Sequence, residues 1–334
     1  MKIAVVGLGA VGGLVAARLA LAGHEVSGLA RGATLAAVRR GGLRLEVAGQ
    51  TQRVELRASD DARTLGAQDL VVIALKGQAL AEAGASIQPL LGAQTTVLPA
   101  MNGVPWWFLQ TLPAGSGLDE AARTAPLASI DPDGRIAAAL PLARVLGCVV
   151  HLTCASPEPG LVRHGFGDRL IVGEPAGGAS ARTDSVCAAL AGAGFTAEPS
   201  ADIRHDVWYK LWGNMTMNPV SALTGATADR ILDDPLVNAF MLRTMSEAAQ
   251  IGARIGCPIA QSGEERQGLA RKLGAFKTSM LQDAQAGRAL EIDALVSAVR
   301  EIGVRVAVPT PNIDALLGLT RLMARERGLY PPAA

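Results

Sequence analysis

The sequence is poor in aromatic residues and in cysteine. Phe, Trp and Tyr together make up 3% of 334 residues, and none of the four cysteines belongs to a Cys-x-x-Cys pair. This spacing argues against a disulfide-stapled scaffold, and no histidine completes a metal-binding pattern. We therefore expect a cytoplasmic protein with reduced thiols and no metal, whose core is packed mainly by Ala, Val, Leu and Gly.

The sequence also lacks an excess of either charge and lacks long apolar runs. The formal net charge is +1, so no strong field attracts nucleic acid or an anionic membrane. The longest apolar runs, such as residues 69–75, are far shorter than the roughly 20 residues of a membrane-spanning helix. The N-terminal segment does not have the pattern of a signal peptide. We expect neither a nucleic-acid partner nor a membrane.

What the first half does contain is an alternation of short apolar runs with helical segments. Residues 10–22 have helical composition, and Gly23 follows where a left-handed residue would end a helix. The runs that suit buried strands are residues 2–6, 25–29, 69–75 and 95–98. This alternation predicts a mainly parallel sheet.

The pattern changes twice further along the chain. Three β-rich runs, at residues 145–153, 161–164 and 169–172, predict antiparallel strands added to the edge of that sheet. A helix is expected over residues 181–193, and almost every segment after residue 201 has helical periodicity. We predict an α/β protein with a Rossmann-type dinucleotide-binding domain at 1–201 and an all-α domain at 202–334.

Residues 7–12, Gly7-Leu8-Gly9-Ala10-Val11-Gly12, match the pattern G-x-G-x-x-G. In dinucleotide-binding folds the first Gly permits a tight turn, the second admits the pyrophosphate and the third permits close packing. The match follows the first strand and opens a helix, whose N-terminus favours phosphate. All six residues are therefore predicted to bind a dinucleotide.

The residue after the second strand bears on which dinucleotide binds. Enzymes that use NAD carry an acid there for the ribose 2′-hydroxyl, but this chain reads Leu29-Ala30-Arg31. The planar guanidinium of Arg31 suits a 2′-phosphate, which favours NADPH. A flavin is an alternative for the same fingerprint, but no flavin-type segment follows.

Two more polar residues follow apolar strands directly. Lys76 comes after Leu75, and Asn102 comes after the run that ends at Met101. Ligands of open α/β sheets bind at the carboxyl ends of the strands, so both residues are predicted to reach the same crevice.

The segment 206–219 carries an unusual polar row. Lys210, Asn214 and Asn218 stand at positions i, i+4 and i+8 of a predicted helix, beside an apolar stripe of Trp and Leu. Pro219 follows and predicts a kink. Such a row is either a solvated face or one wall of a site.

Together these motifs resemble the ketopantoate reductase family over nearly the whole chain. The segments that carry the resemblance are the glycine loop, Arg31, Lys76, Asn102-Gly103, Lys210 to Pro219, Ser279 to Asp283, and Glu291-Ile292-Asp293. The resemblance implies a helical domain like the C-terminal domain of 6-phosphogluconate dehydrogenase.

The same resemblance implies NADPH-dependent reduction of a small 2-oxo acid, with ketopantoate to pantoate, in pantothenate biosynthesis, as the leading reaction. It implies Lys210 as general acid and Glu291 as its acidic partner. Substrate contacts are implied for Asn102, Asn214, Asn218, Ser279 and Glu291, and Lys76 and Asn102 are placed near the cofactor. The chemistry agrees, because a Lys ammonium can polarise a ketone and protonate the alkoxide left by hydride addition.

Ser279 and Glu291 can serve one small substrate only if the helix between them breaks. Twelve residues of straight helix would separate them by about 18 Å. Gly287 lies between, so we predict a break near residues 286–288 and Glu291 close to the start of a second helix.

Three features differ from the family pattern. Phe276 stands where a substrate-binding Asn is expected, Leu290 stands where Thr is common, and the bulky Trp106-Trp107 pair follows Asn102. The Trp pair either shapes the pocket or packs an interface between domains. The identity of the 2-oxo acid is therefore open.

Two other functions stay open on the sequence. One is a β-hydroxyacid or opine-type dehydrogenase, and the other is a redox sensor that binds NADPH without catalysis. Only the enzymes require Lys210 and Glu291. The helical half has enough apolar surface for a homodimer, although that surface can equally be core.

Overall fold

The computed structural model describes residues 1–332, which form two compact units. Unit 1 comprises residues 1–101 and 134–206, and unit 2 comprises residues 102–133 and those from 207 onward. The units differ from the expected two-segment division because residues 102–133 belong with the helical part. We call residues 102–133 the excursion, and no pattern in the sequence predicted that they would leave unit 1.

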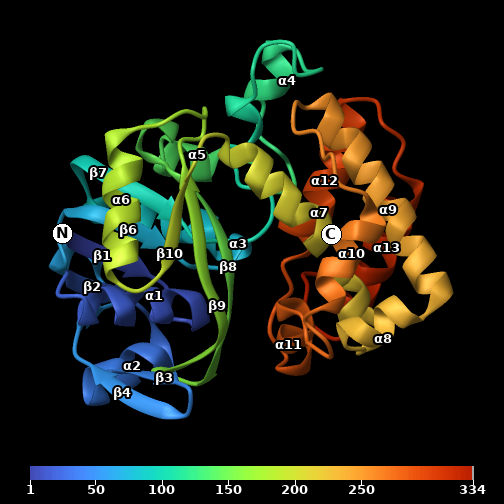
Figure 1. Ribbon diagram of the computed structural model, residues 1–334. Coiled ribbons are helices and arrows are strands. Elements are labelled where there is room, and N and C mark those ends of the chain that lie inside the picture. Colours follow the sequence, from blue (N-terminus) through green and yellow to red (C-terminus); the bar gives the residue numbers. More distant parts are fainter. Residues whose placement is uncertain (333–334) are drawn as a thin grey trace. The chain divides into compact units, whose positions relative to one another are not determined.

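Unit 1 contains the expected parallel sheet (Figure 1). Its strands, in spatial order, are β5 (Arg57–Ser59), β2 (Glu25–Leu29), β1 (Lys2–Val6), β6 (Gln68–Ile73) and β7 (Leu91–Pro99). Every neighbouring pair is parallel, as predicted. The strand order reverses at β1, which places a crevice at the carboxyl ends of β1 and its neighbours.

The predicted antiparallel strands belong to a second sheet, so their placement at the edge of the first sheet was wrong. The order in the second sheet is β10 (Thr196–Ser200), β9 (Leu161–Gly173), β3 (Leu43–Val47) and β4 (Gln50–Val54), with β8 (Gly147–Glu158) also paired to β9. Two of the predicted runs are one long strand, β9. One side of β9 pairs with β8, and its other side pairs with β3 at one end and β10 at the other.

The helix α1 (Ala10–Leu21) packs against strands of both sheets. Its residues 12–17 are all buried, which a helix covered on one side would not need. A Cβ on Gly13 would lie 2.4 Å from Cγ2 of Val162 on β9, so only glycine permits this approach. The small residues of α1 thus follow from its place between two sheets. As predicted, α1 is followed by Gly23 with a positive φ of 85°.

The remaining helices of unit 1 are short. They are α2 (Gly32–Gly41), α3 (Gly77–Ser86), α5 (Arg135–Ala139) and α6 (Ala181–Gly192), with 3₁₀ turns at Ala62–Thr64, Gln88–Leu90 and Leu142–Arg144. One core cluster of the unit consists mainly of Leu, Val and Ala side chains drawn from both sheets and from α1.

Unit 2 is helical, as expected (Figure 1). Its helices are α4 (Glu120–Thr124), α7 (Ile203–Thr224, in this unit from residue 207), α8 (Ala228–Asp233), α9 (Pro235–Arg254), α10 (Gly263–Arg271), α11 (Ser279–Gln285), α12 (Ala298–Arg305) and α13 (Pro311–Glu326), with a 3₁₀ turn at Leu109–Thr111. Within residues 1–332, no helix is both long and apolar enough to cross a membrane.

Aromatic side chains bind the excursion 102–133 to α7. The Phe108 ring stacks on Trp208 with centroids 5.9 Å apart, and Trp106, Trp107 and Phe108 are at most 5% exposed. The Trp pair therefore packs the core of unit 2.

The far end of the excursion is held by charge. The Glu301 carboxylate on α12 accepts hydrogen bonds from the backbone N–H groups of Ala128 and Ser129, each at 2.9 Å. Arg305 donates to Glu301 at 2.7 Å and to the Ala125 carbonyl at 2.9 Å. Burial opposes ionisation of Glu301, but these hydrogen bonds outweigh it and lower its pKa.

Candidate active site

The glycine loop of unit 1 leaves room for a ligand at one position only. Gly7 has a φ of 92°, and a Cβ there would lie 2.8 Å from the Ala74 carbonyl oxygen. A Cβ on Gly12 would lie 1.9 Å from the Gly7 carbonyl oxygen. A Cβ on Gly9 would meet nothing within 4 Å. The outer glycines are therefore required by the protein itself, whereas Gly9 faces open space where a phosphate can approach.

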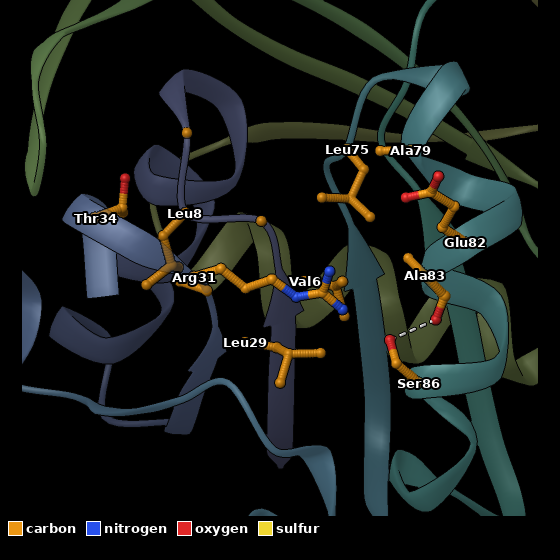
Figure 2. Close-up of a pocket in the computed structure, with 13 residues that line it drawn as sticks. Val6, Leu8, Leu29, Arg31, Thr34, Leu75, Ala79, Glu82, Ala83 and Ser86 are labelled. Carbon is orange, nitrogen blue, oxygen red and sulfur yellow. Dashed lines mark hydrogen bonds between the residues drawn. The ribbon is translucent and has the colours of Figure 1, made fainter. Parts of the chain in front are cut away.

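A pocket of about 320 Å³ lies beside this loop (Figure 2). Of the predicted cofactor residues, Gly7, Leu8, Gly9 and Arg31 line it. Arg31 is exposed and directly precedes α2, and its side chain extends into the pocket. Its guanidinium therefore lies in the pocket, just beyond the carboxyl end of β2.

The opposite wall of the pocket comes from α3, which the sequence reading did not single out. The lining residues Ala79, Glu82, Ala83 and Ser86 follow the spacing i, i+3, i+4, i+7 and so form one face of the helix. Ser86 Oγ donates to the Ala83 carbonyl oxygen at 2.7 Å, while Glu82 brings a carboxylate into the same pocket as Arg31 (Figure 2). The i, i+3, i+4, i+7 spacing of these residues, in the helix that follows β6, was the signal that could have identified this wall.

The other predicted cofactor residues of unit 1 lie next to the pocket. Ala10, Val11 and Gly12 form the first turn of α1, whose N-terminus follows the loop. Lys76 is half-buried and is the N-cap residue of α3, but it does not line the pocket. The starts of α1 and α3 both follow the carboxyl ends of neighbouring strands, as open α/β sheets require.

Unit 2 brings Lys210 and Asn102 together across 108 residues of sequence. Lys210 Nζ donates a hydrogen bond to Asn102 Oδ1 at 2.7 Å, and both side chains are half-buried. The neighbouring Gly103 has a φ of 88°, and its Cβ would lie 2.5 Å from the Ala294 carbonyl oxygen. Val104 N–H donates to the same oxygen at 2.8 Å. The turn after Asn102 thus connects Lys210 to the segment just after Glu291.

The polar row on α7 becomes more buried along the helix. Lys210 and Asn214 are half-buried, and Asn218 is only 5% exposed. The helix continues through Pro219 to Thr224, so the predicted kink does not end it. One turn after Asn218, the hydroxyl of Ser221 hydrogen-bonds with that of Thr278. This bond attaches the buried end of the row to the start of α11.

The predicted break between Ser279 and Glu291 is confirmed. Thr278 caps α11, Ser279 is its first residue, and the helix ends at Gln285 before Gly287, whose φ is 65°. Glu291 is half-buried and directly precedes the next helical turn. That turn is followed by a π-helical segment at Asp293–Ser297, a distortion often found at functional sites.

The other two departures from the family pattern, Leu290 and Phe276, also have structural explanations. Leu290 is fully buried, and its backbone N–H donates to the Leu329 carbonyl at 2.9 Å. A backbone contact therefore supports this turn without the hydroxyl cap that Thr would supply. Phe276 packs against an apolar cluster that includes Met217 and Val220 of α7.

Possible metal ligands and four cysteines lie within residues 1–332. Within residues 1–332, no group of three His, Cys, Asp or Glu side chains could hold a metal ion. None of the four cysteines forms a disulfide, and burial raises the pKa of the Cys154 thiol to about 12, which makes it a poor nucleophile.

Comparisons with known proteins agree with this arrangement. Residues 3–105 match the family model of ketopantoate reductase PanE/ApbA, and residues 202–324 match the model of its C-terminal domain. A 2-dehydropantoate 2-reductase from Mesorhizobium japonicum is 44% identical over 99% of this chain and all of the relative.

Solved structures give the same result. One from Ralstonia solanacearum, described provisionally as a ketopantoate reductase, has a TM-score of 0.93 and 59% identity over 98% of this chain and 99% of its own. A D-mandelate dehydrogenase bound to NADH and anilino(oxo)acetate, at 20% identity over 98% of this chain and 100% of its own, shares the fold with a TM-score of 0.84. With both family models matched and a relative aligned along its full length, this chain belongs to the ketopantoate reductase family.

Proposed function

We propose that this protein reduces ketopantoate to pantoate with NADPH. The observation that carries the proposal is the hydrogen bond from Lys210 to Asn102, in the same unit as Glu291 and the Asn row. This hydrogen bond to an amide oxygen fixes the direction of the Lys210 ammonium before a substrate arrives. The 2-dehydropantoate 2-reductase at 44% identity supports this choice of substrate.

Each predicted residue has a distinct task in this reaction. The bound dinucleotide supplies the hydride that adds to the ketone carbon. Lys210 polarises the ketone oxygen and gives it a proton, which leaves a neutral amine and a 2-hydroxy acid. Asn102 orients the ammonium, and Glu291 acts as the acidic partner of Lys210 and of the substrate. Substrate contacts are assigned to Asn214, Asn218 and Ser279.

Family membership implies a nicotinamide cofactor, and the pocket of unit 1 fits its adenosine and phosphate groups. Gly9 leaves space for the pyrophosphate, and Lys76 and Asn102 follow strands that lead toward the cofactor. The preference for NADPH rests on the guanidinium of Arg31, which can pair with a 2′-phosphate. Glu82 in the same pocket favours a second candidate, NADH, because a carboxylate can accept from a ribose hydroxyl.

Binding measurements separate the two cofactors. Dissociation constants of NADPH and NADH are compared by fluorescence for the wild type, Arg31→Ala and Glu82→Gln. If Arg31 binds the 2′-phosphate, Arg31→Ala weakens NADPH by about tenfold or more and leaves NADH nearly unchanged. If Glu82 binds the ribose, Glu82→Gln weakens NADH selectively, which would reverse our assignment.

The reaction itself is tested by following NADPH absorbance with ketopantoate, pyruvate and branched 2-oxo acids. The proposal expects the highest kcat/KM with ketopantoate. A higher kcat/KM for NADP⁺-dependent oxidation of a β-hydroxyacid or an opine would indicate the alternative dehydrogenases. NADPH binding without turnover of any substrate in this panel would favour the redox sensor.

A further inference from the structure

The C-terminal tail returns to the segment that carries Glu291. Leu290 N–H donates to the Leu329 carbonyl oxygen at 2.9 Å, and Tyr330 Oη donates to Asp293 Oδ1 at 2.6 Å. One bond therefore lies one residue before Glu291, and the other lies two residues after it. The two bonds flank Glu291 on both sides.

The tail is itself fixed by α13. Leu329 is 4% exposed, and its N–H donates to the Ala324 carbonyl at 2.7 Å. The Arg325 guanidinium lies 5.6 Å from the centroid of the Tyr330 ring, and its Nε donates to the Pro331 carbonyl at 3.1 Å. Because these contacts hold the tail against α13, the tail can restrict the movement of the residues that it contacts.

The backbone around Glu291 is irregular. Glu291 directly precedes Ile292, where the helical segment begins, and a π-helical segment follows at once at Asp293–Ser297. Asp293 Oδ1 also accepts from Ser297 Oγ at 2.9 Å, inside the same segment. Burial and the neighbouring Asp293 carboxylate raise the pKa of Tyr330, so its phenol stays protonated and donates.

We propose that the C-terminal tail sets the position of Glu291, and that Tyr330 is the positioning residue. Tyr330 acts through Asp293 and the backbone, without touching the substrate. The inference rests on the role proposed above for Glu291. A displacement of about 1 Å in a catalytic group can lower a rate up to 100-fold. A small displacement of Glu291 should therefore cause a measurable fall in kcat.

The test compares Tyr330→Phe with Ser297→Ala. Tyr330→Phe removes only the hydroxyl that binds Asp293, while Ser297→Ala removes the other donor to the same oxygen and leaves the tail attached. With ketopantoate and NADPH, we expect Tyr330→Phe to lower kcat about tenfold, with an unchanged dissociation constant for NADPH. We expect Ser297→Ala to stay within about twofold of the wild type, because the tail contacts remain.

A double-mutant cycle with Glu291→Gln gives the decisive reading. If Tyr330 acts through Glu291, then Tyr330→Phe causes little further loss of kcat in the Glu291→Gln protein. If the double variant instead loses kcat by the product of the two single losses, Tyr330 has a merely structural role and the inference is overturned. Wild-type kcat for Tyr330→Phe would overturn it as well. If Glu291→Gln itself keeps full turnover, the role proposed for Glu291 fails, and this inference fails with it. A loss in Glu291→Gln but none in Tyr330→Phe overturns the tail inference alone.

Discussion

The two units carry their predicted functional residues in different ways. In unit 1, the glycine loop is six consecutive residues, and its function depends on how closely backbone atoms approach one another. In unit 2, the polar residues come from separate segments, and side-chain hydrogen bonds join Asn102 to α7 and α7 to the residue before α11. A site of the first kind can be recognised from local spacing, whereas a site of the second kind depends on tertiary contacts.

The largest effect we expect separates the chemistry of unit 2 from binding in unit 1. Lys210→Ala should lower kcat about 100-fold or more, because the proton donor is lost. The dissociation constant of NADPH, measured by fluorescence, should not change. Lys272→Ala, at an exposed lysine of the same unit, is the control and should retain full turnover. Equal turnover in both variants would remove Lys210 from the mechanism.

Two glycine variants sharpen the account of unit 1. Gly12→Ala forces a Cβ into the Gly7 carbonyl, which we expect to cost about 2 kcal/mol of folding free energy and to distort the loop. Gly9→Ala has room in the protein and should leave the melting temperature unchanged while weakening NADPH binding. Thermal unfolding without cofactor, followed by titration with NADPH, distinguishes the two. A melting temperature lowered equally in both variants would contradict the distinction between the glycines.

A third prediction concerns how unit 2 holds the 102–133 excursion. Glu301→Ala removes the acceptor of two backbone N–H groups and leaves Arg305 without its carboxylate. We expect the free energy of unfolding to fall by about 2 kcal/mol, measured by urea denaturation. The exposed Glu326→Ala is the matched control on the neighbouring helix α13. No difference between the two variants would mean that Glu301 does not hold the excursion.

The smallest effect is the pH dependence of an ion pair in unit 1. A hydrogen bond from Arg182 lowers the pKa of Glu174 below its usual value of 4.5. Because this pKa is lower in the folded state, the stabilisation is present above pH 4.5 and is lost as the pH falls through the lowered pKa. The pair is partly exposed, so we expect less than about 1 kcal/mol. In acid titrations of stability, Glu174→Gln should lose this part of the slope, and an unchanged slope would count against the pair.

The sequence predicted features whose causes are local. The first two strands, the end of α1 before Gly23 and the break before Glu291 each follow from a few neighbouring residues. A glycine that ends a helix does so through its own backbone freedom, which needs no knowledge of distant parts of the chain.

Features with distant causes could not be predicted. The β-rich runs were identified, but one partner of β9 is β3, which lies more than 100 residues earlier in the chain. Glu82 lines the pocket beside the glycine loop only because α3 turns that face toward the loop. The contact from Tyr330 to Asp293 joins residues 37 positions apart and carries no local pattern.

The chain passes between the units three times, near residues 101, 133 and 206. A gene fragment ending at residue 206 would therefore encode Phe108 without the Trp208 ring that stacks on it. The complementary fragment would encode Lys210 without Asn102. Neither half is suited to separate expression, and exchange of domains between relatives would have to move residues 102–133 together with the C-terminal half.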